Sequence, residues 1–272
     1  MRSVGTPALP VGSGHPLVSV AGPEPLAGYS LTGLSDWFDP FLPEFVRDTL
    51  RCDGTVTLAL SATGAVEGLR IYHPEEGLGS IFSRSPDVAE AMRAERPEGA
   101  FFCELELAAP SERFELFAVD LAEIPPTGEF SYPVRVATAR DLPGVVRSMM
   151  EIHGAYDPRG WVGADPAVER CLVIGLEDRI AGVGWATRAG RRGRLHSVSV
   201  LPRYRRLGLG TELLQARLRW LRAAGAESAL SEIADTNRAS RALAEAAGMR
   251  AVATMRCYAP VRHRPGKVPN PA

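Results

Sequence analysis

The sequence has few cysteines and no apolar run long enough to cross a bilayer. Cys52, Cys103, Cys171 and Cys257 are widely separated, so no pair has the short spacing of a zinc site or a redox dithiol. The N-terminus also lacks the basic and apolar segments of a secretory signal. We therefore expect reduced thiols, no metal, no membrane insertion and a cytoplasmic location.

The chain also lacks an excess of charge. Its 31 Lys and Arg residues nearly balance 32 Asp and Glu residues, which leaves a formal net charge of -1. Because no whole-protein field attracts polyanions, we expect no nucleic acid or membrane partner, and any anion must be bound locally. The length of 272 residues allows one large or two modest domains, and we expect two.

Proline and glycine suggest where the domains begin and end. Residues 1–30 and 261–272 are rich in Pro, Gly and small residues, so both are expected to be flexible. Two prolines and a glycine interrupt the pattern at 123–131, which we interpret as a linker. This division gives an N-terminal α/β domain at 31–122 and a second domain at 132–260.

The second half alternates between strand and helix patterns, which predicts a mixed α/β sheet. Strands are expected at 134–138, 171–175, 180–188, 194–200, 229–233 and 252–258, and helices at 141–152, 208–224 and 237–247. A tight turn at Glu177-Asp178 joins two of the strands. In the longest helix, Leu214, Leu218 and Leu221 repeat at helical spacing, and Gly225 ends the pattern.

The first half repeats this order faintly. A strand, a tight turn and a glycine-bearing strand occur at 57–72 and again at 171–186. A helix at 86–94 and strands at 100–106 and 114–121 follow in the first half. We interpret it as a duplicated copy that has decayed, and the alternative is that two unrelated hairpins look alike.

The segment Arg205-Arg206-Leu207-Gly208-Leu209-Gly210 lies between a predicted strand and the longest helix. Glycine lets the backbone approach a ligand closely, and the first amides of a helix point outward at its positive end. Seven arginines within nineteen residues add local positive charge: Arg188, Arg191, Arg192, Arg194, Arg203, Arg205 and Arg206. The pattern favours a pyrophosphate site, and the alternative is a simple turn with solvated arginines.

Other phosphate motifs are absent from the sequence. There is no Gly-Lys-Ser/Thr of a P-loop, and the third glycine of a dinucleotide fingerprint is missing. Nucleoside triphosphates and NAD are therefore disfavoured as ligands.

In its context, the segment resembles the signature of the GNAT superfamily of N-acetyltransferases, Arg/Gln-x-x-Gly-x-Gly/Ala after the fourth strand. The chain reads Val200-Leu-Pro-Arg-Tyr-Arg205-Arg-Leu-Gly208-Leu-Gly210, and Asn237 and Gly248 match the family's last helix. The resemblance covers 132–260. It implies an α/β (α+β) GNAT fold, with a mixed, mostly antiparallel sheet splayed between strands 4 and 5 and a degenerate GNAT-like copy before it.

The resemblance also implies that acetyl-CoA is the co-substrate. Val198 and Val200 match the backbone positions that bond the pantetheine, and the Val198 amide matches the donor to the thioester carbonyl. The other implied cofactor-binding residues are Arg205, Arg206, Leu207, Gly208, Leu209, Gly210, Thr211, Asn237, Ser240 and Arg241.

Acetyl transfer to an amine needs a base, because a lysine-like amine has an unperturbed pKa of about 10.4. Arg194 occupies the position of a catalytic glutamate in some family members. His196, two residues later on the same strand face, is our predicted base or proton relay, and the alternative is a structural histidine. The other candidates are Glu232, Glu151, His153 and Asp157.

The general acid of the family is also missing. Ala244 occupies the position that often holds a tyrosine, so we expect Tyr258 or water to replace it. The alternative is that Tyr258 is only a strand residue. A thiol pKa of about 8.5 lets CoA leave without full protonation.

We predict an acetyl-CoA-dependent N-acetyltransferase that modifies a primary amine of a small molecule, peptide or protein by direct attack in a ternary complex. The alternative is a decayed acyl-CoA-binding sensor or regulatory protein, which the missing glutamate and tyrosine favour. The first half, whose segment 79–86 lacks paired glycines, is expected to act as a lid, an acceptor-pocket wall or a homodimer surface.

Overall fold

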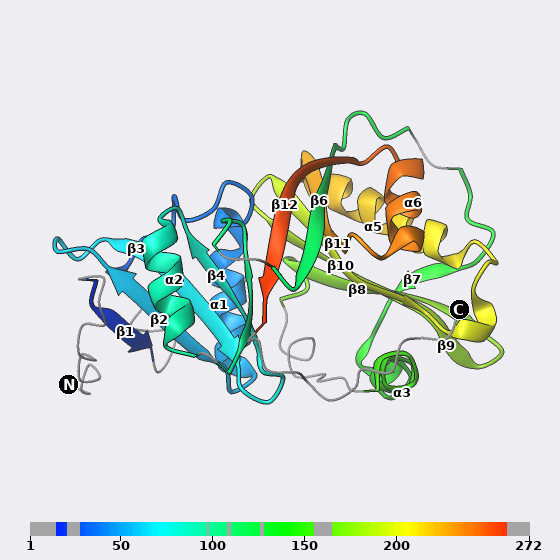
Figure 1. Ribbon diagram of the computed structural model, residues 1–272. Helices are drawn as coiled ribbons and strands as arrows, with labels where there is room; N and C mark the ends of the chain where they lie inside the picture. Colours follow the sequence, from blue (N-terminus) through cyan, green and yellow to red (C-terminus); the bar gives the residue numbers. More distant parts are fainter. Residues whose placement is uncertain are drawn as a thin grey trace. The chain divides into compact units, whose positions relative to one another are not determined.

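The computed structural model describes residues 15–20, 28–96, 98–107, 110–125, 128–154 and 165–259 (Figure 1). Asp157, the tail at 261–272, most of the segment at 1–30 and the middle of the predicted linker lie outside these residues. The chain forms two compact units. The first takes residues 1–36, 53–112 and 256–272, and the second takes 37–52 and 113–255.

This division differs from the predicted domains at 31–122 and 132–260. Helix α1 (Leu42–Arg51) comes from the first half of the sequence but belongs to the second unit. The last three residues of β12 (Arg250–Tyr258) come from the second half but belong to the first unit. Each unit therefore contains one element, or part of one, from the other half of the sequence.

The first unit is built on a mostly antiparallel sheet in the order β1-β2-β3-β4-β5-β12. Its strands are β1 (Leu17–Val20), β2 (Thr55–Leu60), β3 (Val66–His73), β4 (Leu78–Ser83) and β5 (Ala100–Cys103). Only β4 and β5 pair in parallel, and the last residues of β12 pair with β5. Helix α2 (Pro86–Ala94), capped by Ser85, confirms the helix predicted at 86–94.

The second unit continues the pattern as β12-β6-β11-β10-β9-β8-β7. Its strands are β6 (Glu112–Asp120), β7 (Val134–Val136), β8 (Glu169–Leu176), β9 (Arg179–Ala189), β10 (Arg192–Val200) and β11 (Ser228–Ala234). Its further helices are α3 (Leu142–His153), α5 (Leu209–Ala223) and α6 (Arg238–Ala246). Strands β10 and β11 pair in parallel, while β6–β11, β7–β8, β8–β9 and β9–β10 are antiparallel.

These elements confirm the helices and strands predicted for the second half to within a few residues. Glu177 and Asp178 both have positive φ, at 48° and 58°, as a two-residue hairpin turn requires. The sheet of this unit has two covered faces. Helix α5 packs on one, where Gly193 leaves room for Leu221, and α3 packs on the other through Val145 (Figure 1).

Candidate active site

Strands β10 and β11 pair only over their first residues. The parallel ladder joins Arg192–Arg194 to Ser228–Leu230 and then stops, although β10 continues to Val200 and β11 to Ala234. Beyond this point β10 stays paired with β9, and β11 stays paired with β6. The two strands therefore diverge, which confirms the predicted splay between the fourth and fifth strands, counted from β7.

A β-bulge lies on β10 at the splay. His196 pairs with Trp185 and Ser199 with Val183, so Ser197 and Val198 stand opposite the single residue Gly184. Ser197 has a positive φ of 51°. A bulge of this kind re-aims main-chain groups and inverts the side-chain alternation. Ser199 therefore shares the α3 face with His196, and Val198 packs with residues of the α5 face.

The segment that joins β10 to α5 exposes a row of amides. Arg206 and Gly208 have positive φ, at 68° and 88°, and Gly208 is the N-cap of α5. The amides from Arg206 to Gly210 donate to no described residue, while the Thr211 amide donates to the Gly208 carbonyl at 2.9 Å. Successive free amides at a helix start form an anion-binding concavity. Thr211, predicted as a further amide donor, is already engaged.

The side chains of this segment have local partners. Arg205 Nε donates to the Val200 carbonyl at 3.2 Å, and the Tyr204 hydroxyl donates to Glu177 Oε2 at 2.8 Å. The Leu207 side chain is exposed. These contacts fix the approach to α5 and leave the amides to face outward.

His196 lies in a hydrogen-bonded cluster on the α3 face. Its Nε2 is 2.9 Å from Glu169 Oε1 and 3.0 Å from Thr187 Oγ1, and Thr187 also donates to Glu169. Burial raises the pKa of Glu169, but the hydrogen bond and charge of His196, the hydrogen bond from Thr187 and the charge of Arg194 together lower it more, so the net pKa of this carboxyl is lowered. An ionised carboxylate only accepts, so Nε2 carries the proton and Nδ1 is the basic nitrogen.

The basic nitrogen of His196 points to the bulge. Nδ1 is 3.3 Å from Ser197 Oγ, and the ring stacks on Trp185 with centroids 6.4 Å apart. The side chain is about one-fifth exposed, so solvent or a substrate can reach it. His196 is therefore held by hydrogen bonds, as a structural histidine would be, and it still presents a basic nitrogen, as a base or proton relay requires.

The other carboxylate candidates are paired with arginines. Glu232 Oε1 accepts from Arg194 Nε at 2.8 Å, and the Arg194 guanidinium also covers the Phe45 ring of α1 at 4.9 Å. Glu151 accepts from Arg179 at 2.7 Å. Both carboxylates are therefore already engaged in ion pairs with arginines.

His153, at the end of α3, contacts the strand next to the bulge. Its Nε2 is 2.8 Å from Ser199 Oγ. The structure therefore brings His153 and His196 to the same face of β10, on either side of the bulge. Asp157, predicted with His153, lies outside the described residues.

Tyr258 lies in the core of the first unit. It is 2% exposed, and its hydroxyl donates to the Leu105 carbonyl at 2.8 Å and accepts from the Leu107 amide at 3.1 Å. These bonds occupy the hydroxyl and favour the structural alternative. Ala244 is buried in the core of the second unit and carries no acidic group.

The remaining predicted CoA residues lie at the start of α6. The Asn237 side chain caps this helix by accepting from the Ser240 amide at 3.1 Å. Arg241 pairs with Glu115 of β6 at 2.8 Å. The structure brings Asn237 and Ser240 together at the end of β11, and their contact with a cofactor stays a prediction.

Sequence reasoning missed Glu169, Thr187 and Arg217. Glu169 and Thr187 face each other across β8 and β9, which no local pattern shows. The sequence does show Arg217 as unusual, because it lies four residues from both Leu213 and Leu221, on the apolar face of α5. A charged residue at such a position is unusual in a soluble helix.

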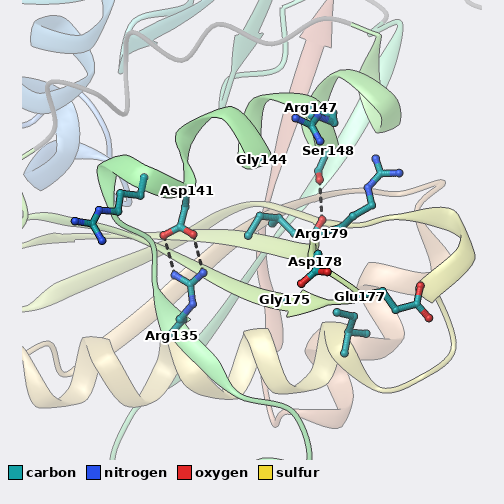
Figure 2. A pocket seen from close by; sticks show the side chains of 12 residues that line it. Arg135, Asp141, Gly144, Arg147, Ser148, Gly175, Glu177, Asp178 and Arg179 are labelled. Atoms are coloured by element: carbon teal, nitrogen blue, oxygen red, sulfur yellow. Dashed lines mark hydrogen bonds and ion pairs between the residues drawn. The ribbon is translucent and has the colours of Figure 1, made fainter.

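A separate polar pocket of about 520 Å³ lies between the start of α3 and the β8–β9 hairpin. Figure 2 shows Arg135 paired with Asp141, with distances of 2.7 and 2.6 Å, and the Ser148 hydroxyl bonded to a main-chain oxygen, that of Ile180. None of the predicted CoA or catalytic residues lines this pocket.

Neither a metal centre nor a membrane-spanning helix is found in the described part of the chain. Its His, Cys, Asp and Glu side chains form no group of three or more that could hold a metal ion. Its helices are all too short or too polar for a bilayer crossing.

A sheet that splays beside a bulged strand, with free amides at the start of the following helix, has the arrangement of the GNAT fold. Residues 145–249 match the sequence profile described as the Acetyltransferase (GNAT) family, so this part of the chain is a GNAT acetyltransferase domain. The family typically uses acetyl-CoA and typically acetylates amines.

Solved structures share the fold over most of the chain. A tandem GNAT protein from the clavulanic acid biosynthesis pathway has a TM-score of 0.59 at 16% identity, covering 89% of this chain and 97% of its own. A GNAT-family protein from Novosphingobium aromaticivorans has a TM-score of 0.54 at 17% identity, covering 70% and 86%. A GCN5-related N-acetyltransferase from Sphaerobacter thermophilus has a TM-score of 0.54 at 14% identity, covering 74% and 79%.

At these identities the similarity concerns the fold, which is that of a tandem GNAT protein. The sequence matches none of the curated proteins with which it was compared.

Proposed function

We propose that the protein transfers an acetyl group from acetyl-CoA to a primary amine by direct attack within a ternary complex. The observation that carries this proposal is the His196–Glu169 pair beside the bulge of the splayed strand. It supplies a base at the place where the GNAT fold binds the thioester.

The donor is held mainly by main-chain groups. The free amides from Arg206 to Gly210 bind the pyrophosphate, and the arginine side chains add charge. Val198 and Val200 bond the pantetheine along the unpaired edge of β10, with Asn237, Ser240 and Arg241 at the end of β11. Because these contacts use the backbone, they tolerate the departures from the family pattern in the side chains.

The proton of the acceptor amine passes to His196 Nδ1, and Glu169 stabilises the imidazolium that forms. The neutral amine attacks the thioester carbonyl, whose oxygen receives a hydrogen bond from the Val198 amide. A carbon–nitrogen bond forms, the carbon–sulfur bond breaks, and CoA leaves as a thiolate. The attacking nitrogen loses its second proton to water, and the thiolate, whose thiol has a pKa of about 8.5, takes a proton from the solvent without help from Tyr258.

The described residues of the first unit form no second loop of free amides at the equivalent position. The connection from β4 to α2 is only Arg84-Ser85, and the Ser85 side chain already accepts from the Val88 amide. Pro86 at the first helical position has no amide proton. These features support a degenerate copy. Helix α1, which comes from the first half of the sequence, belongs to the second unit, and its Phe45 ring contacts Arg194 on the face that carries His196.

The test is CoA release from acetyl-CoA in the presence of a panel of primary amines. The wild-type protein should release CoA in an amine-dependent manner, and His196→Ala should lose roughly 10²-fold or more in rate. His73→Ala, in a strand of the first unit, is the matched control and should keep the rate. Tight CoA binding without any amine-dependent release would establish the alternative, an acyl-CoA sensor.

A further inference from the structure

Arg217 is a buried cation in the middle of the second unit. It is 2% exposed on the apolar face of α5. Burial lowers its pKa to about 10, so it stays charged at neutral pH. Among the described residues no carboxylate pairs with it.

The guanidinium is held by main-chain oxygens instead. Nε donates to the Leu213 carbonyl at 3.1 Å, and Nη1 donates to the carbonyls of Trp185 at 3.2 Å and His196 at 3.4 Å. The two latter residues are the pair that precedes the bulge in the β9–β10 ladder. Arg217 thus ties the two strands together at the point where their register changes.

Gly184 shows how closely the guanidinium lies under the bulge. A Cβ at Gly184 would stand 3.1 Å from Arg217 Nε and 3.2 Å from Cζ. Gly184 is also the single residue opposite Ser197 and Val198. The positive charge is therefore on the α5 side of the bulge, while the His196 imidazole is on the α3 side.

Packing alone does not account for this residue. A buried cation without a carboxylate partner is destabilising, and an apolar side chain of similar volume is often better tolerated. Leucines fill the neighbouring positions of α5. Because an apolar side chain at position 217 would stabilise the fold more, the charged group there suggests a role in the reaction.

We propose that Arg217 is a positioning residue for acetyl transfer, which fixes the bulge so that the Val198 amide and His196 are both aimed at the thioester. Its charge also lies on the α5 side of the strand whose Val198 amide, in the proposed mechanism, donates to the carbonyl oxygen. This inference rests on the function proposed above.

The experiment compares Arg217→Met with Arg217→Lys. In Arg217→Met the kcat for amine acetylation should fall about tenfold or more, while the Kd for CoA changes less than twofold. Arg217→Lys, which keeps the charge and one donor group, should recover part of kcat. Amide hydrogen exchange on the free protein should be about tenfold faster in Arg217→Met at the residues paired on either side of the bulge, His196 with Trp185 and Ser199 with Val183, with amides of the first unit unchanged.

Two results would overturn the inference. Either kcat and the exchange at the bulge are the same in Arg217→Met as in the wild type, or kcat, CoA affinity and thermal stability decline together, which indicates only a structural role. If the wild type shows no amine-dependent release of CoA, the proposed function fails. The exchange measurement still tests whether Arg217 fixes the bulge of β10.

Should Arg217→Met not fold, Gly184→Ala replaces it. The added methyl group displaces the guanidinium by a few tenths of an ångström without removing its charge. The same direction of change in kcat and in exchange is expected, and wild-type values for both would contradict the proposal.

Discussion

The imidazole of His196 and the carboxylate of Glu169 are joined by a 2.9 Å hydrogen bond between Nε2 and Oε1. Glu169 is on β8 and His196 on β10, with Thr187 of β9 between them. Because three strands contribute, the sheet fixes the orientation of the ring. The pair leaves Nδ1 as the only acceptor nitrogen of the imidazole, directed at the bulge.

Removing the carboxylate should therefore weaken the base. In Glu169→Gln the imidazolium loses its ionised partner, and we expect kcat/KM near pH 7 to fall about 10- to 100-fold. Steady-state kinetics over a range of amine concentrations measures this. Thr187→Val removes the hydrogen bonds of the hydroxyl to Glu169 and His196 but keeps the carboxylate in place. It should cost less than tenfold, so equal losses in the two variants would argue against a special role for the carboxylate.

The loop before α5 can be tested through its backbone. Gly208→Ala places a side chain at a φ of 88°, which costs about 1 kcal/mol in the left-handed region. Relief of that strain distorts the row of free amides, so CoA affinity should fall about fivefold or more in a calorimetric titration.

Gly190→Ala is the matched control for the loop. Gly190 has a φ of 58° in the β9–β10 turn, and an added Cβ meets no atom at either glycine. This variant should lose similar stability but bind CoA like the wild type. Equal weakening of CoA binding by both variants would remove the loop from the donor site.

Asp48 on α1 makes stability depend on pH. Burial, and then the negative charge of Glu169, raise the pKa of this carboxyl from 3.8 to about 7. Between these values the folded protein keeps a proton that the unfolded chain releases, so the free energy of unfolding decreases as pH rises through this window. Below pH 4 both states are protonated, and no difference remains.

Asp48→Asn should therefore stabilise the protein at pH 8 but not at pH 4. The side chain is 34% exposed, so we expect a gain on the order of 1 kcal/mol after solvent screening. Urea unfolding at the two pH values measures it, with Asp235→Asn, an exposed carboxyl, as control. A gain of equal size at both values would show that Asp48 is not protonated in the fold.

Tyr258 provides a test of the missing general acid. Tyr258→Phe leaves the Leu107 amide and the Leu105 carbonyl without their partner, so unfolding should become easier by about 1–2 kcal/mol. The kcat of amine acetylation should stay within twofold of wild type. A tenfold or larger loss of kcat in a folded variant would show that Tyr258 takes part in the reaction.

Local pattern was enough to predict the helices and strands of the second half. The helix α5 has leucines at helical spacing and a glycine at each end, and the turn at Glu177-Asp178 has residues that tolerate positive φ. The phosphate segment was recognisable because glycine positions and the helix start are neighbours in sequence.

Long-range pairing could not be predicted in the same way. Contacts between residues far apart in the chain place α1 in the second unit and the end of β12 in the first. The Glu169–His196 pair needs the β8–β9–β10 register, which a bulge then shifts. Tyr258 looked accessible to the reaction only because its partners, Leu105 and Leu107, are some 150 residues away in sequence.

We propose that the second unit catalyses direct transfer of the acetyl group from acetyl-CoA to the amine of a separate acceptor molecule. A single-turnover experiment tests it most directly: the complex of protein and acetyl-CoA is mixed with a reactive amine while free CoA thiol and protein mass are followed. We predict that free CoA appears only after amine is added and that the protein mass never changes. Release of CoA before amine is added, with an acetylated protein, would contradict it.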